Sequence, residues 1–463
     1  MHGGNLRRRR LGALFAALII TLTIVGASTV AGAAQLSGRL VAAHLEQNND
    51  QPDVYAFSLN GVTLVPGTAA ISDQLSQLNG ATVTVTGTMS GTSLVVTGVA
   101  VSYSAAITTP PITGTSAARK VAVIIAQYAD SVPPSAATAR SIVFNGPDSL
   151  DAYMREVFAR STRVIGGRVD VNNGDVFGPV VLGRPANTVR CSVDTVLDEV
   201  GVALTFAHSH AGYEGSYYDN TMVFLPDQPC SLRGVGFTPG STFATRDPSL
   251  AVVAHEFGHN LGLEHAGGRK CWNSAGKRVA LAGSAGRCTT YAYADPFDEM
   301  GNRQLAGQGN RQYNALHKLQ LGALPANARV AATAGTHQYT IAFAEKPIGY
   351  SQLVEIPRRR LANGKVESFV VDYRASYGHF DAWAPTEPVV NGVTVRIHVS
   401  GLLQANEPDT IVVDSTPGSR SGMDDFIDAP LAVGQSLHDP ISGVTITTNA
   451  LGFGLAQFTV SVP

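Results

Sequence analysis

Charged side chains are scarce in this 463-residue sequence: Asp, Glu, Lys and Arg make up 15% of it, and the formal net charge is only -2. A chain without an excess of either sign lacks the basic footprint of nucleic-acid-binding proteins, so no nucleic-acid partner is expected. Apolar residues make up 44%, enough to bury sizeable cores, and the length predicts two or three domains. The 48 glycines, with recurrent Thr, Ser and Val, favour a β-rich extracellular protein.

Cysteine is also scarce, and no Cys-x-x-Cys pair occurs, which argues against a structural zinc knuckle. An even number of cysteines in an exported chain predicts disulfides. We favour Cys191–Cys230 and Cys271–Cys288, because each pair is adjacent in sequence; two other pairings and free thiols are the alternatives. The second disulfide would close a loop of about 18 residues and stabilise the fold by about 3 kcal/mol in the chain-entropy model.

The N-terminus has the order of a secretory signal. Arg7 to Arg10 form a basic block, an apolar run follows from Leu11, and small residues end it at Ala33 and Ala34. We therefore predict a signal peptide over 1–34 and a secreted protein without stable membrane association. The alternative is an uncleaved N-terminal anchor on an outward-facing protein, because the run is long enough to span a bilayer.

Composition divides the remaining chain into four parts. Alternating, Gly-rich strand patterns predict a small β domain over 35–104, barrel-like and similar to an OB fold. A Thr- and Pro-rich linker follows at 105–118. Residues 119–335 begin with a short apolar strand and contain two helical patterns, at 149–159 and 192–207. Recurrent strand patterns over 336–463 predict a β-sandwich.

The pattern that carries chemistry lies in the third part. Asp247-Pro248 predicts a helix start, and Leu250, Val253, Phe257 and Leu261 predict its core face. His255 and His259 are four residues apart and so lie on one face of this helix, as two ligands of one metal ion do. Glu256 is placed beside the metal, where it can act as a general base.

Two further residues make this pattern specific. Gly262 tolerates the left-handed backbone that stops a helix, and His265 follows three residues later. His265 would supply a third nitrogen, leaving the fourth position of a zinc ion open for water and substrate. Taken alone, His255 and His259 could be two ordinary histidines on a surface helix. The full pattern, which adds Gly262 and His265, argues strongly against this alternative.

His-Glu-x-x-His-x-x-Gly-x-x-His resembles the signature of the metzincin zinc peptidases. Those enzymes carry a methionine turn beneath the zinc, and Asp295-Pro296-Phe297-Asp298-Glu299-Met300-Gly301 resembles it, with Met300 as the methionine. The stretch from Asn314 to Gly322, the approach from Phe224 through Gly236 and the strand ending in Tyr373-Arg374 are similar to the gametolysin family. One departure is Ala323, where that family usually has Trp.

The resemblance implies an α+β catalytic domain: a twisted mixed sheet above the zinc helix and an irregular lower part from Gly262 to about Gly322. It implies zinc as cofactor. Calcium at Asp295, Asp298 and Glu299 is a further candidate, although hydrogen bonds to backbone amides of the methionine turn are the interpretation we prefer. His208, His210 and His317 are expected to be structural. A tyrosine often helps to stabilise the oxyanion in related enzymes, and three candidates are equivalent in sequence: Tyr291, Tyr293 and Tyr313. A purely structural role is the interpretation we prefer for each of them.

The small N-terminal domain is either an inhibitory propeptide or a targeting and spacing domain. Many metzincins block their zinc with a propeptide cysteine, but no cysteine precedes Cys191, so that device is excluded here.

We therefore predict a monomeric zinc endopeptidase that hydrolyses extracellular or cell-wall proteins, with a protein or peptide substrate as its partner. A zinc-dependent cell-wall amidase and a surface-binding module with an inactive zinc site are the two alternatives.

Overall fold

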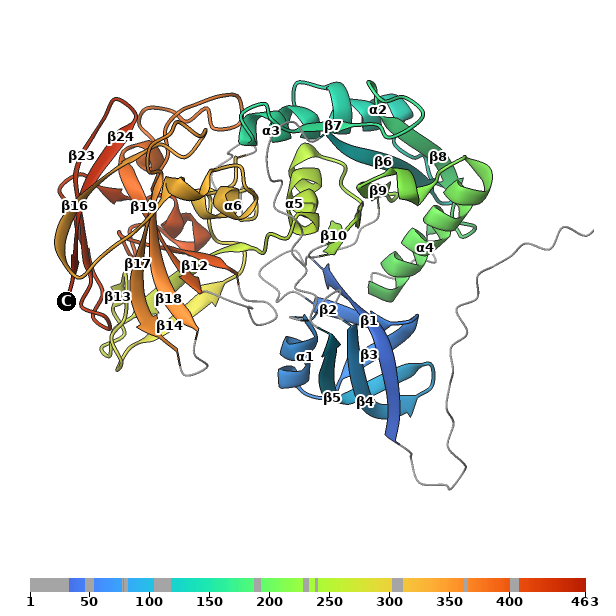
Figure 1. The fold of residues 1–463 in the computed structure, drawn as a ribbon, viewed down its shortest axis with the longest axis horizontal. Coiled ribbons are helices and arrows are strands. Elements are labelled where there is room, and N and C mark those ends of the chain that lie inside the picture. Colours follow the sequence, from blue (N-terminus) through green and yellow to red (C-terminus); the bar gives the residue numbers. More distant parts are fainter. Residues whose placement is uncertain are drawn as a thin grey trace, which may run out of the picture.

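A computed structural model describes residues 33–45, 54–76, 78, 82–103, 118–186, 193–227, 233–237, 240–301, 311–361, 365–399 and 408–463. Over these residues the protein is mixed α/β, with several mixed sheets and few helices (Figure 1). The predicted signal and linker lie outside them, except for Ala33, Ala34 and Ala118, which belong to strands. Cys191 and Cys230 also lie outside. No helix among the described residues is long and apolar enough to cross a membrane.

The first part is a closed ring of five strands. Its order is β1-β2-β3-β5-β4-β1, because β1 pairs with both β2 and β4. Asn60 and Gly61, with φ of 52° and 79°, form the tight turn between β2 and β3. Leu40, Phe57, Val85 and other apolar residues fill the interior. The elements are β1 (Ala33–Leu45), β2 (Val54–Leu59), β3 (Val62–Pro66), α1 (Ala69–Ser76), β4 (Thr82–Ser90) and β5 (Ser93–Tyr103).

The second part is a sheet in the order β10-β11-β9-β6-β7, with β8 also paired to β6. Side chains of β6 alternate between its two faces. Val121, Val123 and Ile125 pack with α3 and α5, and the alternate residues pack with α4. The elements are β6 (Ala118–Gln127), α2 (Ala136–Arg140), α3 (Leu150–Val157), β7 (Arg163–Ile165), β8 (Asp175–Val181), α4 (Val193–His210), β9 (Asn220–Phe224), β10 (Gly234–Phe237), β11 (Thr242–Thr245) and α5 (Leu250–Asn260).

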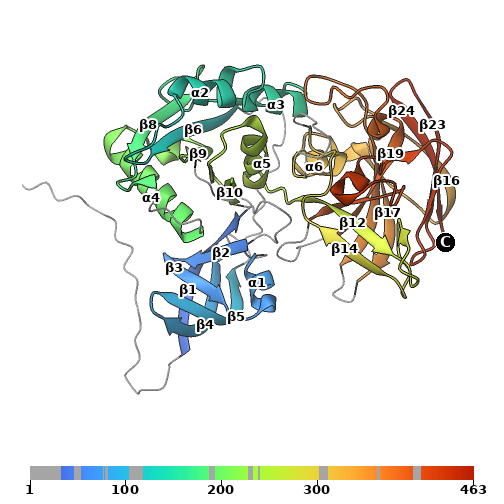
Figure 2. The same cartoon turned by 180° about the vertical axis from the view of Figure 1, so that it is seen from behind.

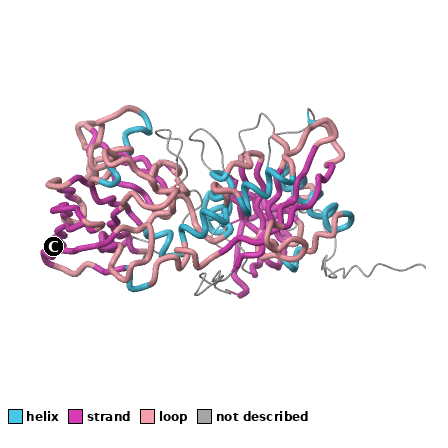
Figure 3. The backbone as a smooth tube through the Cα atoms, turned by 90° about the horizontal axis from the view of Figure 1, so that it is seen from above, coloured by secondary structure: helices cyan, strands magenta, loops and turns pink. Residues whose placement is uncertain are grey.

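Two sheets that share one apolar core form the third part. The larger runs β13-β12-β20-β19-β18-β17-β15, and the smaller runs β16-β24-β23-β22. Figure 3 shows helices gathered between this strand-rich region and the second sheet. The elements are β12 (Ala266–Trp272), β13 (Arg278–Val279), β14 (Arg287–Tyr291), α6 (Ala315–Gln320), β15 (Arg329–Ala331), β16 (Gly335–Ala342), β17 (Leu353–Arg360), β18 (Val366–Tyr373), β19 (Gly392–Val399), β20 (Thr410–Val413), β21 (Leu431–Ala432), β22 (Ser436–His438), β23 (Thr445–Gly452) and β24 (Leu455–Val462).

The larger sheet crosses the boundary predicted at 335/336. Strand β12 begins directly after His265 and pairs in parallel with β20, from Ala266 opposite Thr410 to Arg269 opposite Val413. Strands β13 and β14 pair with β12. The expectation of an irregular segment after Gly262 is therefore wrong for residues 266–272, 278–279 and 287–291, which form β12, β13 and β14 because β12 finds partners both nearby and far along the chain. The predicted Cys271–Cys288 disulfide is present and joins directly opposed residues of β12 and β14.

The helices predicted at 149–159 and 192–207 are confirmed as α3 and α4, and the zinc-motif helix as α5. The start of α5 differs: Ser249, and not Asp247, is its N-cap. Asp247 Oδ1 instead accepts the Ser249 N–H at 3.1 Å, so this carboxylate orders the turn just before the helix.

Candidate metal centre

Every residue of helix α5 except Ala251 is buried, and the helix ends in a turn that its sequence dictates. Gly262 has φ of 97°, the left-handed conformation expected at this position. Its N–H donates to the His259 carbonyl at 2.9 Å, and the Leu263 N–H donates to the Gly258 carbonyl at 3.0 Å. This pair of bonds is a Schellman motif, which turns the chain back so that His265 returns to the helix.

The turn brings three imidazoles together. One nitrogen from each of His255, His259 and His265 lies within 4.8 Å of the other two, and all three side chains are buried. His259 Nε2 and His265 Nε2 are 3.1 Å apart. Nitrogens bound tetrahedrally to one zinc ion lie about 3.3 Å apart, given bonds of about 2.0–2.1 Å. The spacing fits a shared metal ion.

Hydrogen bonds prepare two of these rings for metal binding. His255 Nδ1 donates to the Glu299 carbonyl at 2.9 Å, and His259 Nδ1 donates to the Leu263 carbonyl at 2.8 Å. Each ring then carries its proton on Nδ1 and presents a lone pair on Nε2. The Nε2 atom of His255 is buried without a hydrogen-bond partner. A buried nitrogen lone pair in this position is satisfied when a metal ion binds.

Glu256 lies against strand β10, where two glycines make room for it. A Cβ on Gly234 would come within 2.0 Å of Glu256 Oε1, and one on Gly236 within 2.6 Å of Oε2. The Gly236 position is also 3.0 Å from His259 Cβ. Residues two apart in a strand face the same side, so Gly234 and Gly236 together open the space for the carboxylate. Glu256 itself is fully buried beside the histidines.

Met300 lies beneath α5, in the turn predicted for it. The Met300 side chain is fully buried, and a Cβ on Gly258 would meet its Sδ at 2.4 Å. The Met300 carbonyl accepts the Ala266 N–H at 2.9 Å, which links this turn to the residue after the third histidine. The turn therefore supports the helix and the returning chain at once.

Carboxylates within the turn bind backbone amides. Asp295 Oδ1 accepts the Phe297 N–H at 2.9 Å, and Asp298 Oδ1 accepts the Met300 N–H at 2.6 Å. Glu299 Oε2 accepts the Arg311 N–H at 3.0 Å. The contacts of Asp295 and Asp298 are those expected for carboxylates that bond backbone amides of the methionine turn, and Glu299 bonds a backbone amide outside it.

Of the three candidate tyrosines, Tyr293 is the one whose ring packs against the histidine cluster. Its ring centroid is 4.0 Å from that of His265 and 6.0 Å from that of His255. The hydroxyl of Tyr313 instead donates to the Ala254 carbonyl at 2.8 Å in the core. The Tyr291 ring packs under Lys270 Nζ at 5.6 Å.

Buried charges tie this region to the C-terminal sandwich. Arg396 of β19 pairs with Asp295 at 2.6 Å and with Asp372 at 2.7 Å. Arg374 donates to the Phe297 carbonyl at 2.8 Å. Sequence alone did not identify Arg396, because its partners lie in separate elements. The arginines hold the methionine turn on the sheet.

His317 is structural, as expected. Its two nitrogens lie 2.9 Å from Asp298 and 2.7 Å from Asp409, all three side chains being buried. Burial opposes the positive charge, but the two carboxylates outweigh it and raise the pKa of His317 to about 10. Burial also opposes the Asp298 charge, yet His317 and backbone N–H donors lower the Asp298 pKa to about 2. His208 and His210 lie at the exposed end of α4, away from this cluster.

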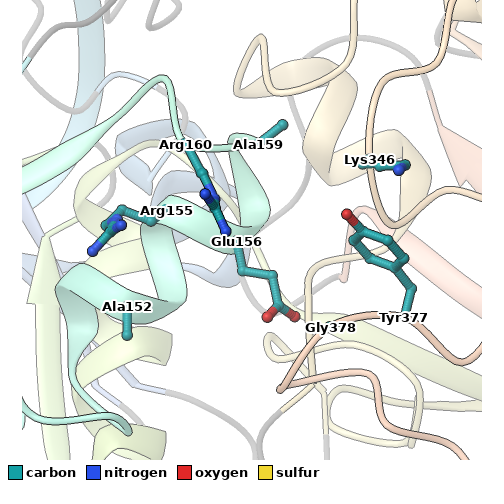
Figure 4. Close-up of a pocket in the computed structure, with 8 residues that line it drawn as sticks. All are labelled: Ala152, Arg155, Glu156, Ala159, Arg160, Lys346, Tyr377 and Gly378. Atoms are coloured by element: carbon teal, nitrogen blue, oxygen red, sulfur yellow. The ribbon is translucent and has the colours of Figure 1, made fainter.

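A separate cavity of about 420 Å³ lies between α3 and the sandwich, and no residue that lines it belongs to the histidine cluster (Figure 4). Arg155, Arg160 and Lys346 give it positive charge. Glu156 also lines this cavity, and its carboxylate accepts hydrogen bonds from the His379 and Phe380 N–H groups at 2.7 and 3.0 Å. Glu156 thus fastens the two parts of the protein together.

No family model matches this chain, and no curated protein is significantly similar to it.

Proposed function

We propose that this protein is a zinc-dependent endopeptidase of the metzincin type, most similar to the gametolysin family. The observation that carries the proposal is the convergence of three buried imidazoles beside a buried glutamate, on one helix and the turn that follows it. Three protein nitrogens with a fourth position open are typical of catalytic zinc rather than structural zinc.

His255, His259 and His265 would hold the metal through nitrogen. When bound, zinc polarises the scissile carbonyl and acidifies water. Carbonyl groups of Glu299 and Leu263 accept hydrogen bonds from Nδ1 of two of the rings, which fixes the ring orientation and leaves Nε2 as the ligand nitrogen. A ligand set of three imidazole nitrogens favours zinc over magnesium or calcium, which prefer oxygen ligands.

Glu256 acts as the general base and then as the general acid. It takes the proton from the attacking water and delivers it to the departing amine nitrogen. The Tyr293 phenol, beside His265, donates a hydrogen bond to the oxygen that gains negative charge.

Secretion is part of the proposal. The Cys271–Cys288 disulfide supports an oxidising compartment, in agreement with the signal-like N-terminus.

The test is hydrolysis of casein by the purified protein, with a chelator, with zinc restored, and with Glu256→Gln. We expect hydrolysis that the chelator abolishes and zinc restores. Glu256→Gln should retain stoichiometric zinc by elemental analysis and lose turnover. A zinc-loaded Glu256→Gln variant with normal activity would contradict the mechanism.

A further inference from the structure

The cavity between α3 and the sandwich, called the α3 cavity below, is bounded by segments that are far apart in sequence. Figure 1 and Figure 2 both show the end of α3 beside loops of the sandwich. Its volume of about 420 Å³ is within the range of small-molecule sites. The residues that line it are Ala152, Arg155, Glu156, Ala159 and Arg160 on the α3 side, and Lys346, Tyr377 and Gly378 on the sandwich side.

Small residues keep this space open. Ala152 and Ala159 contribute only methyl groups from the α3 side. On the sandwich side, Gly378 has φ of 76°, the left-handed region that glycine adopts freely. A Cβ on Gly378 would lie 2.4 Å from the Glu156 carboxyl group. Glycine at this position therefore lets the sandwich loop approach α3 without filling the cavity.

The cavity carries an excess of positive charge. Three cationic side chains and one carboxylate line it. That carboxylate, Glu156, is engaged by the sandwich backbone: Oε2 accepts the His379 N–H at 2.7 Å and Oε1 accepts the Phe380 N–H at 3.0 Å. Within the part of the chain that the structure describes, Arg160 and Lys346 form no ion pair. Two cations from different parts of the protein thus line one cavity without a counter-charge of their own.

The backbone at the end of α3 fixes the position of Arg160. The Ala159 N–H donates to the Glu156 carbonyl at 3.1 Å, and the Arg160 N–H donates to the Arg155 carbonyl at 2.5 Å, as in a Schellman motif. Glycine is usual at the left-handed position of this motif, but Ala159 has φ of 47° and Arg160 has φ of 70°. Two successive non-glycine residues in this conformation are strained, and such strain is common at binding sites. Figure 4 shows Arg160 extending from this turn toward Glu156, whereas Arg155 points away from Tyr377.

Lys346 and Tyr377 supply polar groups from the sandwich side. Lys346 Nζ lies 4.6 Å from the centroid of the Tyr377 ring, a cation–π contact. The Tyr377 hydroxyl points into the space between the sandwich loop and α3 (Figure 4). The helix dipole explains a cation at the end of α3, such as Arg160, but not Lys346, which belongs to another segment. An anionic ligand between the two explains both.

We propose that the α3 cavity binds a tetrahedral oxyanion, phosphate or sulfate, free or as an ester group, between Arg160 and Lys346. Guanidinium and ammonium groups are usual partners of such oxygens. Donors approach from α3 and from two sandwich loops, which suits oxygens arranged tetrahedrally better than the two coplanar oxygens of a carboxylate. The bound anion links α3 to the sandwich and so stabilises the folded protein. The site is independent of the metal centre, because no residue of the histidine cluster lines it.

The test is calorimetric titration of the metal-free full chain with inorganic phosphate and, separately, with inorganic sulfate, at constant ionic strength. Metal-free protein is used so that the anion cannot bind a zinc ion. Arg160→Gln and Lys346→Gln each remove one cation, from opposite sides of the cavity. The matched control is Arg155→Gln, which removes a cation of the same helix that points away from Tyr377 and lies 3.9 Å from Asp151. Circular dichroism verifies that all three variants are folded.

We expect one anion to bind per wild-type chain. Affinity should fall at least about tenfold in Arg160→Gln and in Lys346→Gln, because each loses a hydrogen bond between charged groups. It should change less than about threefold in Arg155→Gln. Amide hydrogen exchange of residues 155–160 and 376–380 should slow when phosphate is added. The absence of saturable binding to the wild type would overturn the proposal, as would equal losses of affinity in all three variants.

Two further titrations define the anion. Acetate that binds as tightly as phosphate would overturn the choice of a tetrahedral oxyanion. Methyl phosphate that binds as tightly as inorganic phosphate supports a group carried on a larger molecule, whereas binding at least about tenfold weaker supports the free ion. Thermal unfolding gives an independent measurement: phosphate should raise Tm for the wild type and Arg155→Gln, and much less for Arg160→Gln. Equal rises in the wild type and Arg160→Gln would place the anion elsewhere and overturn the proposal.

Discussion

Gly258 and Met300 lie in contact across the candidate metal centre, with the Met300 Sδ only 2.4 Å from where a Cβ on Gly258 would be. Gly258 stands between His255 and His259 in sequence, and Met300 follows Glu299, whose carbonyl orients His255. The distance between helix and turn is thus set by the absence of a side chain at position 258. A change at either residue alters the spacing of the ligands.

Gly258→Ala should lower the free energy of unfolding by about 1–3 kcal/mol, because the added methyl group overpacks a filled core. Zinc affinity should fall as well. Urea unfolding and zinc titration measure the two effects. Gly201→Ala is the control: this glycine is exposed within α4 with nothing near its Cβ position, so alanine should stabilise by about 0.5–1 kcal/mol. In a double-mutant cycle, free-energy changes of Gly258→Ala and Met300→Ala that simply add in the double variant would argue against a direct contact between the two residues.

Tyr293→Phe should reduce kcat about 100-fold at nearly unchanged KM, because it removes one donor to the developing negative charge. Zinc content should be unaffected. Tyr291→Phe is the matched control and should retain activity, since its ring packs against Lys270 instead. Equal losses for the two variants in steady-state kinetics would assign Tyr293 a packing role only.

Arg396→Met should destabilise the protein by about 3–5 kcal/mol, because Asp295 and Asp372 would remain buried without their shared counter-charge. The surface pair of Arg329 and Glu355 is the comparison, and Arg329→Met should cost less than about 1 kcal/mol. Denaturant unfolding of the metal-free proteins measures both. Similar costs for the two variants would show that burial does not strengthen the Arg396 pairs.

His317 should make stability depend on pH above neutrality. Its pKa is raised from 6.5 to about 10 in the fold, so its stabilisation is complete below pH 6.5 and is lost as the pH rises to about 10. Burial lowers the pKa of neighbouring Lys318 to about 8, which acts in the opposite direction between about pH 8 and 10.5. The free energy of unfolding of metal-free wild type and of His317→Gln, measured at pH 6, 8 and 10, separates the contribution of His317 from that of Lys318. The wild type should lose on the order of a few kcal/mol more of its free energy of unfolding than the variant between pH 6 and pH 10. If the two proteins lose stability in parallel over this range, the pH dependence does not come from His317.

Local features of the site could be predicted from the sequence. The course of α5 follows from its apolar periodicity, and the turn at Gly262 follows from the left-handed backbone that only glycine adopts freely. Because both signals span a few residues, the positions of His255, His259 and His265 were also predictable.

Contacts between distant segments could not be predicted in this way. The pairing of β12 with β20 joins Ala266 to Thr410, and that of β1 with β10 joins Leu45 to Val235. Strand patterns predict strands but not their partners, so composition placed a domain boundary where a sheet is continuous. Tyr293 could not be distinguished from Tyr291 and Tyr313 for the same reason: its role depends on where the chain returns.

The continuity of the larger sheet has a consequence for biosynthesis. His265 is followed at once by β12, whose parallel partner β20 ends at Val413. Strands β13 and β14 emerge soon after β12, but the ribosome must add about another 150 residues after His265 before β12 can pair with β20. The strand that follows His265 therefore gains its long-range partner only when most of the polypeptide has been made. Premature termination anywhere before β20 would leave β12, the strand that follows His265, without this partner.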